Sequence, residues 1–158
     1  MGPTTTAALL SLTLVAGTVL VHFYLLLPVL RRVAARRWGY GVRMLVAGEI
    51  IVLVHCLEAA LYAAGFAGGA AIGLGGFDKA ELPMSALDYF YFSLVNFNTL
   101  GLGDIYPTEQ LRMLAGIESL NGFLMISCSA SFLHALATDS GFAKEARMGQ
   151  TSDAAQPA

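Results

Sequence analysis

The sequence predicts an all-α membrane protein with three transmembrane helices and one shorter helix that enters the membrane without crossing it. Three observations support this fold class: few charged residues, three long apolar stretches, and a fourth, shorter apolar stretch that ends in glycines. Hydrophobic residues make up 56 % of the 158 residues and charged residues 13 %, whereas soluble domains carry about 25 % charged residues. The composition therefore indicates lipid as the main surroundings of the chain.

The three long stretches cover residues 7–30, 44–66 and 111–137. Each reaches the length of about 20 apolar residues that a membrane span needs, and each should be helical because a backbone in hydrocarbon must satisfy its own hydrogen bonds. The fourth stretch, residues 85–98, is too short to cross. It is followed by Gly-x-Gly-Asp within residues 99–104, so we expect a re-entrant segment there, since irregular backbone at membrane depth must line a watery cavity or be buried in protein.

Length, charge and cysteines restrict the function further. The chain is long enough for one domain, and its net charge of −2 gives no electrostatic basis for binding nucleic acid. Cys56 and Cys128 lie inside apolar stretches, so we expect buried free thiols rather than a disulfide. Residues 7–30 have no basic segment before them and no cleavage pattern after them, which favours a membrane span over a signal peptide.

Basic residues predict the orientation in the membrane. Five of the nine lie between the first two spans, namely Arg31, Arg32, Arg36, Arg37 and Arg43. By the positive-inside rule this loop is cytoplasmic, so the N-terminus and the glycine loop are external. Lys144 and Arg147 follow the third span, which agrees with a cytoplasmic C-terminal tail. Residues 67–84, rich in glycine and alanine, are expected to form an external loop.

The glycine loop has the pattern of a cation site. Gly101 and Gly103 alternate with Leu100 and Leu102, and glycine adopts positive φ at little cost. A run of carbonyl groups that face the same way replaces the water shell of a dehydrated potassium ion, and Thr99 adds a hydroxyl. A short helix before the loop would direct the negative end of its dipole at the cation.

From Asp88 to Pro107 the sequence DYFYFSLVNFNTLGLGDIYP resembles the potassium-channel pore family. The resemblance covers about residues 44–137 and implies a pore domain made of an outer helix (44–66), an external loop (67–84), a pore helix (85–98), a selectivity filter (99–104) and an inner helix (111–137). Residues 1–43 are then an additional N-terminal span with a basic loop, and residues 138–158 a short tail. The resemblance also implies K⁺ ligands at Thr99, Leu100, Gly101 and Leu102, a gating hinge at Gly122, and a homotetramer, since one loop cannot enclose an ion and closed rings are the usual solution.

The sequence departs from the family pattern at three positions. Leu102 stands where the family usually has tyrosine, so the hydroxyl that ties the filter to the surrounding helices is lost. Asn98 replaces a threonine, and Val95 replaces a glutamate that pairs with the filter aspartate in some members. We expect Tyr91 to serve Asp104 instead, through its hydroxyl. These departures leave open a cation channel that passes sodium as well as potassium.

Residues 7–30 contain no arginine, so this span is not a charged voltage sensor. We expect passive K⁺ conduction with no voltage sensor, no ligand-binding domain, no cofactor and no enzymatic activity. The first span is expected to pack outside the outer helix, facing lipid. A prokaryotic inner membrane is our interpretation of the compact architecture.

Ionisable residues inside spans are costly and are functional candidates by default. His22 and His55 fall at similar depths, and His55 and Glu58 share a helix face. Two interpretations remain open for His22, His55 and Glu58: a polar contact that docks the first span onto the second, or a proton- or metal-sensitive gate.

Two further polar residues fall in the third span. Glu118 either braces the pore helix from behind or faces the cavity, and a position facing the cavity is also open to Asn121. Small residues such as Ser129 more often mark close helix packing.

Two rivals come from other function classes. An intramembrane metalloenzyme built on His55-x-x-Glu58 lacks the His-Glu-x-x-His arrangement of zinc proteases. The second alternative function is that of a non-conducting accessory membrane subunit.

Overall fold

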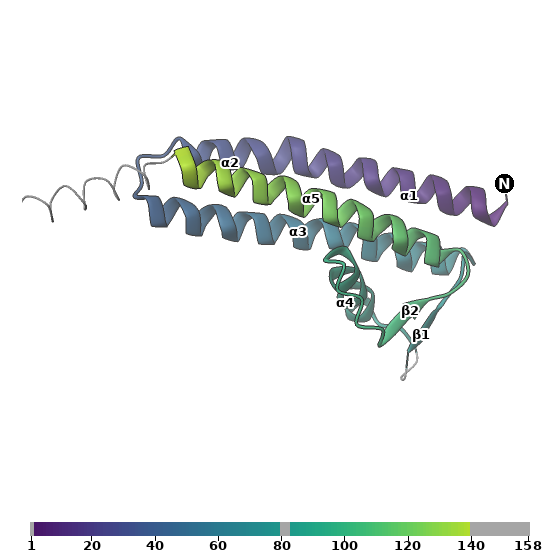
Figure 1. Ribbon diagram of the computed structural model, residues 1–158. Coiled ribbons are helices and arrows are strands. Elements are labelled where there is room, and N and C mark those ends of the chain that lie inside the picture. The colour runs from purple at the N-terminus through teal and green to yellow at the C-terminus, as the bar shows by residue number, and fades with distance from the viewer. Residues whose placement is uncertain (1, 80–82, 140–158) are drawn as a thin grey trace, which may run out of the picture.

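The computed structural model describes residues 2–79 and 83–139. Within them, three helical stretches are long and apolar enough to cross a membrane, and they lie side by side as a bundle (Figure 1). These stretches are Pro3–Ala34, Tyr40–Ala71 and Leu111–Thr138. The predicted all-α membrane fold class is therefore confirmed.

The first stretch is built from three consecutive segments: α1 (Pro3–Leu20), the π-helical η1 (Val21–Leu26) and α2 (Leu27–Ala34). A short turn leads into α3 (Tyr40–Ala71), and the chain later returns through α5 (Leu111–Asp139). At 1.5 Å per residue α3 is about 48 Å long, against a hydrocarbon core of about 30 Å. The apolar stretch at 44–66 is thus the middle of a longer helix.

The helix α3 continues into the region expected to be an external loop, and the reason is close packing at its glycines. A side chain on Gly65 would collide with Leu14 of α1, and one on Gly69 would press against Leu111 at the start of α5. Because glycine lets neighbouring helices approach closely, this end of α3 is held between two partners. The expectation of a loop from residue 67 onward was therefore wrong for Ala67–Ala71.

A small antiparallel sheet, also unexpected, follows α3. Strand β1 (Phe77–Lys79) pairs with β2 (Ile105–Pro107), with Asp78 opposite Tyr106. Phe77 packs edge-on against Phe66 of α3, with ring centroids 5.5 Å apart, and against Phe92, with centroids 5.0 Å apart. These aromatic contacts bury the base of the hairpin.

Residues 80–82 and 140–158 lie outside the described residues, and the latter include Lys144 and Arg147 of the tail.

The fourth predicted apolar piece is the helix α4 (Ala86–Phe97). It lies beside α3 and α5, on the half of the bundle that carries the hairpin and the N-terminus (Figure 1). The basic turn between α2 and α3 lies at the opposite end.

From the sequence we expected the first span to pack against the outer helix only, but the structure shows a second partner. It contacts α5 as well as α3, and the Asn121 amide of α5 donates a hydrogen bond to Thr18 Oγ1 over 2.7 Å. Asn121 is only 4 % exposed. Of the positions open to Asn121, the structure therefore shows one against α1 and not one that faces a cavity.

Two hydrophobic clusters form the core. One surrounds α4 and includes Tyr62, Phe66 and Phe97, and the other joins α2, α3 and α5 at the basic end. Between them along the helices lie the buried polar residues His22, Glu58 and Ser129.

Candidate functional site

The backbone at the end of α4 reverses direction through a Schellman motif. The Leu100 N–H donates to the Val95 carbonyl over 3.0 Å, and the Thr99 N–H donates to the Asn96 carbonyl over 2.9 Å. Thr99 has a φ of 58° at the position where this motif normally places glycine. A side chain in the left-handed region costs about 1–2 kcal/mol, and such outliers often occur at functional sites. The glycine loop thus leaves the helix at a strained residue.

The glycine loop alternates in backbone handedness. Thr99, Gly101 and Gly103 have φ values of 58°, 55° and 79°, whereas Leu100 and Leu102 between them are not in the positive-φ region. Alternating left- and right-handed residues cancel the rotation that a helix would accumulate, so successive peptide groups tend to keep one orientation. Gly101 and Gly103 satisfy this requirement without a side-chain clash.

A side-chain contact ties the loop to α4. The Tyr91 hydroxyl donates a hydrogen bond to Asp104 Oδ2 over 2.8 Å, so the contact that the sequence predicts is present. The hydrogen bond to the Asp104 carboxylate raises the pKa of the Tyr91 phenol. Asn98, in contrast, donates to the Leu94 carbonyl over 2.7 Å, so it secures the end of α4 rather than the loop.

The other end of α4 is fixed by a capping box and an ion pair. Ser85 Oγ accepts from the Asp88 N–H, and Asp88 Oδ2 accepts from the Ser85 N–H, which satisfies two free donors of the helix start. Lys79 Nζ of β1 lies 2.7 Å from the same carboxylate oxygen. The hydrogen bond from Lys79 and those from Ser85 lower the pKa of Asp88 to about 2.

Glu118 of α5 braces α4 from behind. Its carboxyl contacts the Ser93 hydroxyl through one oxygen and the Asn96 amide through the other. Ser93 also donates to the Ala59 carbonyl of α3 over 2.6 Å. Glu118 has no exposed surface, so the alternative in which it faces the cavity does not hold in this structure.

Gly122 of α5 faces the last residue of α4. A side chain at Gly122 would collide with the carbonyl oxygen of Phe97. The glycine therefore has a packing reason, which does not require a hinge, and α5 is one helix from Leu111 to Asp139.

The short helix α4, a glycine loop with alternating handedness and two flanking spans are thus present in one chain, and a family model described as "Ion channel" matches residues 49–139. The chain belongs to this ion channel family. No curated protein matches the chain, and no solved structure does. Membership of a channel family favours ion transport over the metalloenzyme alternative.

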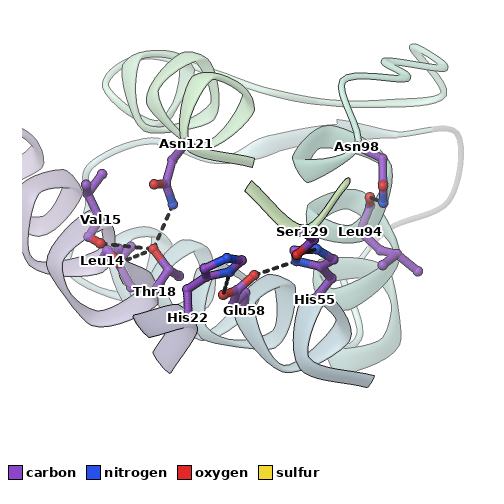
Figure 2. Close-up of polar contacts among 10 residues, drawn as sticks. All are labelled: Leu14, Val15, Thr18, His22, His55, Glu58, Leu94, Asn98, Asn121 and Ser129. Atoms are coloured by element: carbon purple, nitrogen blue, oxygen red, sulfur yellow. Dashed lines mark hydrogen bonds and ion pairs between the residues drawn. The ribbon is translucent and has the colours of Figure 1, made fainter. Parts of the chain in front are cut away.

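This ion channel contains a polar cluster where η1 of the first span meets α3 (Figure 2). Glu58 Oε1 lies 3.3 Å from His22 Nδ1, and Glu58 Oε2 lies 2.7 Å from His55 Nδ1. The structure brings together the three residues that the sequence placed at similar depths. His134, by contrast, is exposed on α5.

Sequence reasoning missed several hydroxyl and amide partners of the channel. Ser93 and Asn96 hold Glu118, Ser119 donates to Asn96 Oδ1, Thr18 holds Asn121, and Ser129 lies 3.1 Å from His55 Nε2. The available signal was the presence of hydroxyl and amide side chains inside apolar helices, where they usually bond to a neighbouring helix. The partner of each depends on helix rotation, which the sequence does not reveal.

Proposed function

We propose that this ion channel conducts K⁺ selectively and passively, through a pore formed by four copies of the chain. In this proposal the K⁺ ligands are backbone carbonyls of Thr99, Leu100, Gly101 and Leu102, with Gly103 and Asp104 completing the filter. The observation that carries the proposal is the alternating backbone handedness of this segment directly after a pore helix. Such a backbone offers a row of carbonyls to a dehydrated cation.

The surroundings of the segment support the same function. The carboxyl end of α4 leads into the loop, so its partial negative charge favours a nearby cation. Leu100 and Leu102 are 65 % and 58 % exposed in the single chain. Assembly around an axis would cover these apolar side chains and would surround the ion with four loops.

We propose further that the loop end of the bundle is external and the C-terminus cytoplasmic. The five arginines between the first two spans gather at the end opposite α4, and cytoplasmic loops carry such an excess. The prokaryotic inner membrane is the compartment that we propose. Residues 2–30 contain no arginine or lysine, so the first span supplies no gating charge.

The test is rubidium uptake into proteoliposomes that contain the purified protein, with sodium as the competing ion. Gly101→Ala should abolish uptake because residue 101 has a φ of 55°, where a side chain is strained. Gly41→Ala is the matched control, since residue 41 has open space and no positive φ. Rubidium uptake that sodium does not reduce, lost only in Gly101→Ala, supports the proposal. Absence of flux from folded wild type at any pH or voltage favours the accessory-subunit alternative.

A second candidate is a channel that passes sodium and potassium equally. It is favoured by Leu102, which is exposed and has no hydroxyl to fix the filter. Equal sodium and rubidium flux in wild type, with rubidium preference gained in Leu102→Tyr, would identify this function instead.

A further inference from the structure

We propose that His22, His55 and Glu58 form a binding site for one divalent transition-metal ion of the zinc class, which joins the first span to the pore-forming helices. This inference concerns a site apart from the glycine loop and does not depend on which ion the pore conducts. It also departs from the expectation, drawn from the sequence, that the protein has no cofactor.

The geometry of the cluster converges on one point. One potential ligand atom from each of the three side chains lies within 4.8 Å of the other two. Both histidine Nδ1 atoms face the same carboxylate, at 3.3 Å for His22 and 2.7 Å for His55. Zinc binds imidazole nitrogen and carboxylate oxygen at about 2.0–2.2 Å, so a small rearrangement of these side chains that opens space for an ion between them gives three protein ligands. Two imidazoles and a carboxylate are a ligand set that zinc accepts.

The burial of the cluster favours an ion. His22 and Glu58 have no exposed surface, and the His55 side chain is 12 % exposed. A single buried carboxylate facing two imidazoles suits a cation, because unpaired charge is expensive in a low-dielectric interior.

The backbone of the first span is irregular at His22. The Leu27 N–H donates to the His22 carbonyl, five residues earlier, within the π-helical segment Val21–Leu26. Pro28 follows, and because proline has no N–H it cannot bond to the carbonyl of Tyr24, which loosens the turn before it. π-helical turns inside α-helices are often found at functional sites. Here the wide turn begins beside the histidine that reaches across to α3.

A third helix supports the ligands. His55 Nε2 lies 3.1 Å from Ser129 Oγ of α5, and a hydrogen bond at one ring nitrogen leaves the other free to bind a metal. The site therefore takes ligands from η1 and α3 and an outer partner from α5. The family match begins at residue 49, so His22 comes from the part of the chain outside the family match. A bound metal would clamp that additional span to the channel.

The experiment measures metal binding directly. The parent protein carries Cys56→Ala and Cys128→Ala, so that thiols do not contribute, and is purified without a polyhistidine tag. Co²⁺ alone is titrated in detergent and its visible absorption is recorded, because four-coordinate Co²⁺ gives a strong, distinctive band. We expect one Co²⁺ per chain, displaced by Zn²⁺. His22→Gln, His55→Gln and Glu58→Gln should each abolish the band, and Ser129→Ala should weaken binding about 10–100-fold.

Two matched variants control for non-specific binding. His134→Gln removes the remaining histidine, and Glu49→Gln removes an exposed glutamate from α3, and neither should change the titration. A parent protein that binds no Co²⁺, or binding that survives in all three ligand variants, would overturn the proposal.

A ligand variant that fails to fold would give no information, so a second measurement uses protein in which His22, His55 and Glu58 are intact. This protein is loaded with zinc and examined by X-ray absorption. A nitrogen and oxygen shell with scattering from two imidazoles supports the site. A shell without imidazole scattering, or one that contains sulfur in the protein with intact cysteines, contradicts it.

Discussion

Gly122 of α5 lies directly against the carbonyl of Phe97, the last residue of α4. The contact joins two elements whose relative position sets where the glycine loop begins. We predict that Gly122→Ala destabilises the protein by about 1–3 kcal/mol, the usual cost of overpacking, and displaces the pore helix. The measurement is the thermal unfolding midpoint in detergent, together with rubidium uptake.

Gly116→Ala is the matched control for this prediction. Residue 116 lies on the same helix with no atom within 4 Å of an added side chain, so alanine there should be neutral or slightly stabilising. A Gly122→Ala protein with normal stability and altered gating would favour the hinge interpretation over packing.

At Glu118 we expect alanine and glutamine substitutions to differ in their effect on stability. Glu118→Ala removes one hydrogen-bond partner each from Ser93 and Asn96 behind α4. Because Ser93 keeps the Ala59 carbonyl and Asn96 keeps the Ala115 carbonyl, we expect a total loss of about 1–3 kcal/mol. Glu118→Gln keeps one donor for Ser93 and one acceptor for Asn96, so it should retain most of the stability and the flux. Thermal unfolding of both variants tests this, with the exposed Glu49→Ala as control. Equal losses in the alanine and glutamine variants would mean that the charge of Glu118, rather than its hydrogen bonds, is required.

The third prediction concerns the Tyr91 hydroxyl, without which we expect the glycine loop to hold its conformation for a shorter time. Tyr91→Phe removes the hydrogen bond to Asp104 and keeps the ring, so we expect folded protein whose rubidium flux decays several-fold faster during prolonged recording. Because the pKa of Tyr91 is raised, the donor persists up to and somewhat beyond the usual phenol value, and the contact is lost as pH rises through the raised pKa. Tyr89→Phe, on the same helix, is the control. Unchanged flux in Tyr91→Phe would assign Asp104 another support.

We expect acid to weaken the start of α4, because the Asp88 carboxylate holds it in place. Its pKa is about 2, below the ordinary value of 3.8, because of Lys79 and Ser85. A lowered pKa means that the contribution to stability is complete above the ordinary value and is lost as pH falls towards 2. The thermal midpoint of wild type should therefore drop between pH 4 and pH 2 more steeply than that of Asp88→Asn. Identical profiles for wild type and Asp88→Asn would contradict the prediction.

The additional first span illustrates what the sequence could predict. Its length and apolar composition established a membrane helix, and the depths of His22 and His55 predicted that they approach each other. The contact with α5 was not predictable, because it depends on the rotation of α1 about its axis. Small shifts, such as the wide turn at Val21–Leu26, change which face meets a neighbour, and one sequence does not report rotation.

The small sheet shows a different limit. Its strands, Phe77–Lys79 and Ile105–Pro107, have three residues each. Strands this short carry too little periodicity to be distinguished from a loop. Their pairing depends on Phe66 and Phe92, which lie on separate helices and meet Phe77 only after the chain has folded.

The sequence by itself determined the membrane fold class, the number of spans, the place of the pore helix and the glycine loop, and the resemblance to a channel family. It could do so because hydrophobic length and glycine spacing are local properties of the chain. Only the tertiary structure decided the partners of Glu118 and Asn121, the contact between Gly122 and Phe97, and the convergence of His22, His55 and Glu58. Those contacts join residues far apart in sequence, and helix rotation and close packing determine them.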